Sequence, residues 1–196
     1  MVAAYHLIWT VYGWWLANDP RGSSSHEIRV VELASLGPVH YGRKPVQPSS
    51  KELREFYKSA QDLLRHQILC FTDEEIALVA EIIAKVIREN KYTCYACAVM
   101  PEHAHLVIRR HKDHAEDMIK KFQQATRDAL IAAGKRSVTH PVWGGPGWKV
   151  FLNTPEEIRG CIVYVDDNLE KAGRPAQSWG FVTMYDGWMP WNPWHH

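Results

Sequence analysis

The sequence lacks any long uninterrupted apolar segment. None of its stretches reaches the about 18 consecutive apolar residues that a membrane-spanning helix needs. The opening residues, Met1 to Thr10, also lack a basic segment followed by a long apolar one, so they do not form a signal peptide. We therefore expect no membrane association and, by default, a cytoplasmic location.

Cysteine is scarce as well. Four cysteines in a chain of 196 residues do not suggest a disulfide framework. Cys94 and Cys97 form a C-x-x-C pair in a segment with the composition of a strand, where a spacing of three residues would place the two thiols on opposite faces. Because no second such pair completes a zinc ribbon, we interpret them as reduced core cysteines.

The chain has no excess of charge of one sign. Its net charge is +1, whereas a general nucleic-acid binder usually shows a strong basic excess. Any binding to nucleic acid must therefore come from local patches. Arg109 and Arg110 at the end of an expected strand, and Lys120 and Lys121 on the following helix, could contact phosphates. A solvated charged face explains these four residues about as well.

Tryptophan, in contrast, is abundant, with nine in the chain. Several tryptophans fall outside the expected core elements and could stack on unpaired bases: Trp14, Trp15, Trp179, Trp188, Trp191 and Trp194. Packing against the domain or across a dimer is the commoner fate of a tryptophan. We assign no role to the tail from Trp191 to His196.

Composition and periodicity predict one domain over residues 1–196, with an inserted loop region at about 13–50 and an irregular tail at about 174–196. Within 13–50, a short strand is expected near 28–33. The remaining elements are a strand at 5–11, helices at 51–66 and 72–90, strands at 92–100 and 103–110, a helix at 113–133 capped by Asp113, a short strand-like piece at 149–152 and a helix from 153 or 154 to 169.

Without the insertion this order is close to β-α-β-β-α-β. The predicted fold class is therefore α+β, with a ferredoxin-like antiparallel sheet and helices on one face. The hairpin formed by 92–100 and 103–110 supplies its central strands.

Two histidines on that hairpin are candidates for metal ligation. His103 and His105 are separated by one residue, so on a strand both side chains point to the same side. Two imidazoles on a rigid strand make half of a metal site. An isolated H-x-H pair is more often a pair of surface histidines, so its interpretation depends on what else lies nearby.

Tyr164 and Asn168 supply the other half of a specific arrangement. They are four residues apart and share one face of a helix. A tyrosine hydroxyl with a pKa near about 10 is a poor nucleophile, but a cation on the scissile phosphate assists its attack. His103, His105 and Asn168 can hold Mg²⁺ or Mn²⁺ and leave positions open for phosphate and water. Attack by Tyr164 then gives a covalent phosphotyrosine, which preserves bond energy for rejoining.

These motifs resemble those of the single-tyrosine HUH transposases, which include insertion-sequence and REP-associated tyrosine transposases. The segment from Met100 to Ile108 is similar to the family's MPNHxHLLI motif, and the segment from Tyr164 to Gly173 to its YIxxNPVKAG motif. The first strand at 5–9, the lysine-containing segment at 119–126 and the pair Val142-Trp143 also fit the family.

The resemblance implies a ferredoxin-like HUH domain, usually dimeric, that nicks and rejoins single-stranded DNA beside hairpins. His103 and His105 match the metal ligands, Tyr164 the nucleophile and Asn168 the third ligand position. Three departures bear on substrate and activity more than on fold. Glu102 and Leu169 replace an asparagine and a proline, and Asp166-Asp167 adds carboxylates. Glu102 or Asp167 could thereby also reach the metal.

The sequence thus predicts a Mg²⁺- or Mn²⁺-dependent DNA transesterase that acts on single-stranded or hairpin DNA through a 5′-phosphotyrosine, as a homodimer. One alternative is a domesticated single-stranded or hairpin DNA-binding protein without transposition activity. A second is a metal-dependent hydrolase that uses water as nucleophile. The sequence leaves open whether Tyr164 serves its own subunit's histidines or the partner's.

Overall fold

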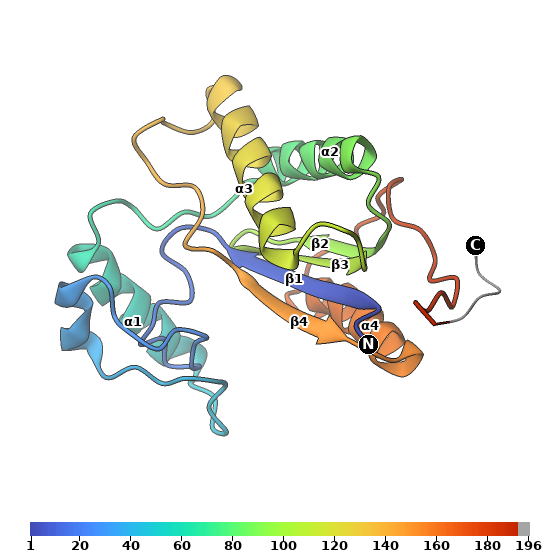
Figure 1. The fold of residues 1–196 in the computed structure, drawn as a ribbon. Coiled ribbons are helices and arrows are strands. Elements are labelled where there is room, and N and C mark those ends of the chain that lie inside the picture. Colours follow the sequence, from blue (N-terminus) through green and yellow to red (C-terminus); the bar gives the residue numbers. More distant parts are fainter. Residues whose placement is uncertain (192–196) are drawn as a thin grey trace.

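A four-stranded antiparallel sheet organises the computed structural model, which describes residues 1–191 (Figure 1). The strands are β1 (Ala4–Thr10), β2 (Cys94–Val99), β3 (His103–Arg109) and β4 (Trp148–Leu152), in the order β2-β3-β1-β4. With α2 (Asp73–Asn90) after β1 and α3 (Ala115–Ala132) after β3, the chain follows the β-α-β-β-α-β order of the predicted ferredoxin-like fold. The histidine pair lies on β3, an inner strand, as predicted, but β2 is an outer strand, so the prediction that both strands of the hairpin are central is wrong. The second inner strand is β1, which pairs with both β3 and β4.

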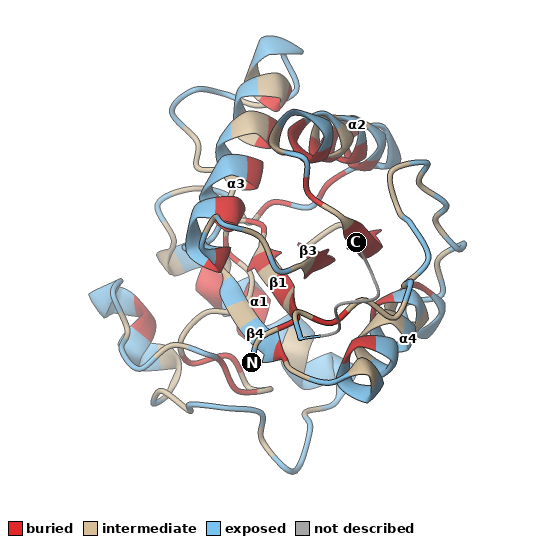
Figure 2. Cartoon of the chain, turned by 45° about the vertical axis from the view of Figure 1, so that its right-hand side comes forward, coloured by how far each residue is buried: buried red, intermediate tan, exposed pale blue. Residues whose placement is uncertain are grey.

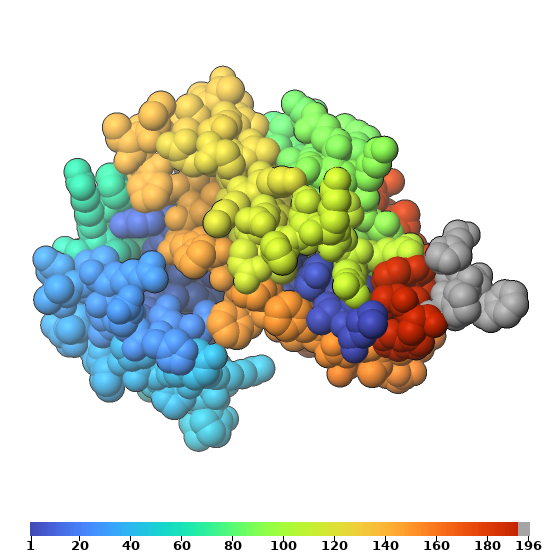
Figure 3. All heavy atoms as spheres, viewed as in Figure 1, coloured from blue at the N-terminus to red at the C-terminus, as the bar shows by residue number. Residues whose placement is uncertain are grey.

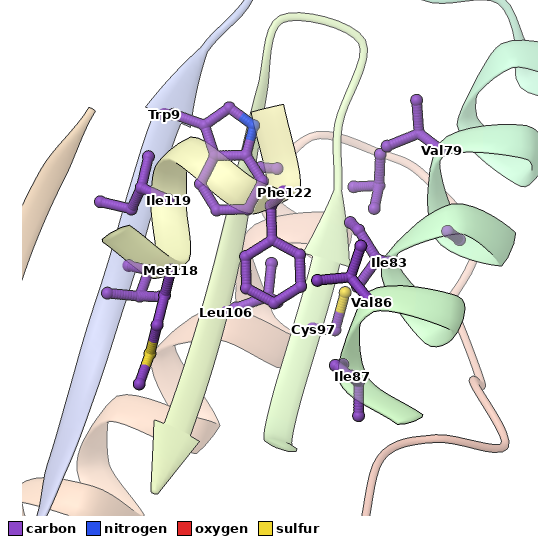
Figure 4. Packing of buried hydrophobic residues seen from close by; sticks show 14 of the residues in the cluster. Trp9, Val79, Ile83, Val86, Ile87, Cys97, Leu106, Met118, Ile119 and Phe122 are labelled. Atoms are coloured by element: carbon purple, nitrogen blue, oxygen red, sulfur yellow. The ribbon is translucent and has the colours of Figure 1, made fainter. Parts of the chain in front are cut away.

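The face of the sheet that carries the odd-numbered residues of β1 packs against α2 and α3. Figure 4 shows the centre of this core, where Leu106 and Ile83 lie near Phe122. The rings of Trp9 and Phe122 stack with centroids 5.8 Å apart. Both helices are amphipathic, with buried residues at helical spacing on the inner side and exposed residues outside (Figure 2). These two helices lie on one face, as predicted.

The helix α4 (Pro155–Lys171) lies on the opposite face of the sheet. The prediction that the helices lie on one face is therefore wrong for α4. Its buried residues Ile158, Val165 and Leu169 pack against small and branched side chains of the sheet, among them Ala98 and Val107. The physical reason is that β2 is buried along its whole length, so both of its faces need a cover.

Residues 13–63 form a lobe beside the sheet rather than a layer over it (Figures 1 and 3). It contains a 3₁₀ helix, η1 (Val31–Leu36), in place of the short strand expected near 28–33, and α1 (Ser50–Leu63), which packs on η1. The helix at 51–66 was thus predicted to within a few residues. Because α1 contacts η1, it belongs to the lobe.

The prediction that Cys94 and Cys97 lie on opposite faces is wrong. The register between β2 and β3 shifts between Cys94 and Ala96, which is the mark of a β-bulge, and both cysteines join the core under α2. Both thiols are free and buried, and burial raises the pKa of Cys94 to about 12. They are reduced core cysteines, as expected.

The cap of α3 also differs from the prediction. The residue at its N-cap is His114, and the carboxylate of Asp113 instead accepts hydrogen bonds from the Tyr92 hydroxyl at 2.6 Å and from Nζ of Lys121 at 2.8 Å. The side chains of Tyr92 and of Lys121, which lies further along α3 itself, therefore take this carboxylate in place of the N-terminal backbone of the helix.

The segment 174–191 contains no helix or strand and runs along the outer edge of β2. The side-chain amide of Gln177 accepts from the backbone N–H of Val99 at 2.9 Å and donates to its carbonyl at 2.8 Å, and Val182 forms a bridge with Cys94. This segment therefore covers one edge of the sheet. Across residues 1–191, the structure contains no helix that is both long and apolar enough to span a membrane.

Candidate active site

His103 and His105 lie side by side on the face of the sheet that α4 covers. The intervening Ala104 points into the opposite core, as strand alternation requires. Both imidazoles are buried, and their ring centroids are 4.6 Å apart at a right angle. Rings in this arrangement can each turn one nitrogen toward a shared cation.

A third histidine, His6 of β1, completes the cluster, and sequence reasoning did not identify it as a site residue. Its Nε2 lies 2.9 Å from Nδ1 of His105, and the two rings are stacked. Burial lowers the pKa of His6 to about 4, and burial together with the neighbouring imidazoles lowers the pKa of His105 well below its ordinary value. Both rings are therefore neutral at pH 7. The signal in the sequence that could have identified His6 is that it is a polar residue in an otherwise apolar strand.

The lobe contributes the wall beside His103. The ring of Trp15 meets His103 edge-on with centroids 5.1 Å apart, and the guanidinium of Arg21 stacks on Trp15 at 3.9 Å. Oε1 of Glu102 lies 3.5 Å from Nδ1 of His103. Burial alone would raise the pKa of Glu102, but the contact with His103 and the charge of Arg21 outweigh burial and hold this pKa below its ordinary value. Glu102 is therefore ionised beside the histidine pair.

Tyr164 lies over the histidines of its own chain. Thr154 caps α4 by accepting from the N–H of Glu157, with Pro155 in the first turn, and the helix then crosses the sheet. The ring centroid of Tyr164 is 5.9 Å from those of both His6 and His105. Its side chain is 47% exposed, so a large ligand can reach it.

Asn168 lies one turn further along α4. Its side-chain nitrogen donates to the backbone carbonyl of Tyr164 at 2.7 Å, and none of the hydrogen bonds within residues 1–191 joins it to the histidines. This bond leaves the amide oxygen free. Asp167 is engaged by Lys171 at 3.2 Å. The structure thus gathers His103, His105 and Tyr164, and places Asn168 one helical turn from Tyr164.

The donor atoms fit a hard or borderline divalent cation. Nδ1 of His103 is buried without a well-formed hydrogen bond, and an imidazole nitrogen without a partner has ligand capacity to spare. The part of the chain that the structure describes holds no group of three or more His, Cys, Asp or Glu side chains arranged around a metal. A cation at this pair would therefore need a neutral ligand such as Asn168, with oxygens from water or substrate in the remaining positions.

The four basic residues predicted to bind DNA are spread over two faces of the molecule. Arg109 ends β3 on the histidine face, where its guanidinium stacks on Trp188 at 3.6 Å and lies 3.9 Å from Asp186. Arg110 follows it and is exposed. Lys120 and Lys121 lie on α3, across the sheet from the histidines, and Lys121 is bonded to Asp113.

Most of the tryptophans singled out above pack against the protein. Trp14 donates to the carbonyl of Leu69 at 2.6 Å, Trp179 packs on the core, and Trp188 covers Arg109. Trp191 is exposed, and Trp194 lies outside the described residues.

Comparisons with known proteins give similarities of fold. None of the family models matches the chain, and none of the curated proteins does. A solved structure of a REP-associated tyrosine transposase bound to a REP hairpin is similar with 13% identity, over 87% of this chain and 68% of that one, at a TM-score of 0.47. A candidate transposase from Deinococcus radiodurans R1 is similar with 17% identity, over 86% and 91%, at a TM-score of 0.40.

Proposed function

We propose that this chain is a metal-dependent DNA transesterase that nicks and rejoins single-stranded or hairpin DNA through a 5′-phosphotyrosine on Tyr164. One observation carries the proposal: a half-exposed tyrosine lies against a buried histidine cluster of the same chain, with ring centroids 5.9 Å from His105. A tyrosine that served only to pack the helix on the sheet would be buried.

The residues have the following roles in this proposal. Oη of Tyr164 attacks the phosphorus in line, the bond from phosphorus to the 3′ oxygen breaks, and the tyrosine proton is lost to water while the 3′ oxygen gains one. The products are a free 3′-OH and a 5′-phosphotyrosine, and attack by a 3′-OH on that linkage reverses the step. His103, His105 and Asn168 would hold Mg²⁺ or Mn²⁺, which neutralises charge on the phosphate when bound.

The neutral ligand set suits this substrate. Two imidazoles and an amide add no negative charge that would repel a DNA phosphate, and Arg21 offsets the charge of Glu102 nearby.

We further propose that the protein works as a homodimer. The candidate interface is the exposed edge of the sheet at β4.

The decisive experiment is a denaturing gel for covalent protein–DNA adducts. The full chain is incubated with labelled hairpin and single-stranded oligonucleotides and Mn²⁺, alongside Tyr164→Phe, His103→Ala and the matched control Tyr41→Phe, an equally exposed tyrosine of the lobe. We expect an adduct that requires the cation, is lost in the first two variants and persists in the control.

Other outcomes of this gel point to other functions. Binding without an adduct across a varied set of oligonucleotides would favour a DNA-binding protein without transposition activity. Cleavage that survives Tyr164→Phe would favour a hydrolase with water as nucleophile.

A further inference from the structure

His6 makes a direct, buried contact with one of the two candidate metal ligands. In the β1–β3 register, His6 pairs with Val107 and Ile8 pairs with His105, so the two histidines are diagonal neighbours on one face. Their rings are stacked at 26° with centroids 5.1 Å apart, and Nε2 of His6 is 2.9 Å from Nδ1 of His105. This distance is that of a normal hydrogen bond.

Two ring nitrogens 2.9 Å apart need one proton between them, which either Nδ1 of His105 or Nε2 of His6 can carry. If Nδ1 of His105 carries it, Nε2 of His105 keeps a lone pair and can bind a cation. If Nε2 of His6 carries it, the proton of neutral His105 sits on its Nε2, and that nitrogen cannot bind a cation. The direction of this hydrogen bond therefore decides whether His105 is a competent ligand.

We propose that His6 is a positioning residue: by accepting from Nδ1–H of His105, it fixes the tautomer and ring orientation that present Nε2 of His105 to the cation. This inference rests on the proposed function, because it takes His103 and His105 as the cation's ligands. Metal-binding histidines commonly donate their second N–H to such a partner, and loss of the partner weakens metal binding about 10–100-fold.

A role for His6 as a third ligand fits the geometry less well. Its Nε2 is already occupied by His105, and the described residues offer no triad of His, Cys, Asp or Glu side chains around a common point. Binding a cation through that nitrogen would break the hydrogen bond that orients His105.

The test measures Mn²⁺ binding to the full chain without DNA, by the loss of the free-ion signal in electron paramagnetic resonance. His6→Phe keeps a ring but cannot accept, whereas His6→Gln places an amide oxygen near the position of Nε2. His26→Phe, on a histidine of the lobe that stacks on Tyr41, is the matched control. Thermal unfolding of each variant shows whether it folds.

We expect His6→Phe to bind Mn²⁺ about 10–100-fold more weakly than wild type. His6→Gln should recover most of the affinity, and His26→Phe should leave it unchanged. Wild-type affinity in His6→Phe, or equally weak binding in folded His6→Gln and His6→Phe, would overturn the proposal. Ring ¹⁵N spectra of the wild-type protein give a second readout that needs no variant. Nδ1–H on His105 supports the proposal, and Nε2–H on His105 refutes it.

Failure of this inference can be told apart from failure of the proposed function. Mn²⁺ binding that depends on His103 and His6 but yields no DNA adduct would overturn the transesterase and leave the role of His6 intact. Adduct formation by the wild-type protein, together with unchanged Mn²⁺ affinity in His6→Phe, would overturn the role of His6 and leave the transesterase intact. Absence of Mn²⁺ binding in the wild-type protein would overturn both.

Discussion

Two arginine–carboxylate pairs in the lobe have the same sequence spacing and opposite environments. The carboxylate of Asp19 is fully buried, accepts from Nε and Nη2 of Arg21 at 2.9 and 2.8 Å, and also accepts from the hydroxyl of Tyr57. Glu27 and Arg29 also form a pair, but their side chains are 71% and 77% exposed. Only the first pair holds a charge that would be left buried if its partner were removed.

We therefore expect Asp19→Ala to lower the free energy of unfolding by roughly 2–4 kcal/mol, because Arg21 and Tyr57 lose their shared acceptor. Glu27→Ala should change it by less than about 0.5 kcal/mol. Urea denaturation followed by circular dichroism measures both. Equal effects of the two substitutions would mean that the buried network contributes no more than a surface pair.

At the level of residues, the sequence pointed to candidate residues that share one element and missed the contacts that join two elements. The spacing of His103 and His105 and that of Tyr164 and Asn168 follow from strand and helix periods, so local pattern was enough. The contact of His6 with His105 depends on the register of β1 against β3, and that of Trp15 with His103 on the path of a loop. Neither is encoded in local periodicity.

One carboxylate links three elements on the α2–α3 side of the sheet. Asp113, between β3 and α3, accepts from Tyr92 before β2 and from Lys121 of α3, and Lys121 also donates to Asn90 at the end of α2. Two hydrogen bonds hold the pKa of Asp113 at about 2, below its ordinary value of 3.8. The bond from Lys121 has the larger effect and the bond from Tyr92 the smaller one.

A carboxyl with a depressed folded-state pKa stabilises the protein above its unfolded pKa and loses that effect as pH falls through the folded one. Wild type should thus be more stable than Asp113→Asn at pH 7, and the difference should shrink between about pH 4 and 2. Denaturation series from about pH 5 downward measure it. Asp128→Asn, at an exposed carboxylate of α3, is the control and should show no such trend. A pH-independent difference for Asp113→Asn would contradict the assignment.

The elements themselves were largely predictable, and their placement less so. A capping box of Thr72 and Glu75 begins α2, and Pro155 follows the N-cap Thr154 of α4. Such caps lie within a few residues of the helix start, so the beginnings of both helices are predictable from local sequence. The bulge in β2 and the packing of α4 on the second face arise from burial of β2 on both sides, which depends on the assembled sheet.

The two edges of the sheet differ in a way that bears on assembly. The segment 174–191 covers β2, whereas β4 is an outer strand that presents exposed Trp148, Val150 and Phe151. A lysine on an edge strand usually discourages pairing with another chain, but Nζ of Lys149 bonds Glu116 of α3 at 2.5 Å. The edge at β4 therefore keeps both free backbone groups and apolar side chains for a second copy of the chain.

We expect the protein to be a homodimer in which the β4 strands of two copies pair, and Val150→Lys to make it a monomer. Val46→Lys, at a more exposed valine of the lobe (83% against 41%), is the matched control and should stay dimeric. Light scattering after size-exclusion chromatography gives the masses. A dimer that survives Val150→Lys would show that the interface lies elsewhere, and a monomeric wild-type protein would show that there is no such interface.

Because Tyr164 meets the histidines of its own chain, the Val150→Lys monomer should still form the covalent DNA adduct. Loss of the adduct in that monomer would indicate that the active arrangement in solution takes its tyrosine from the partner.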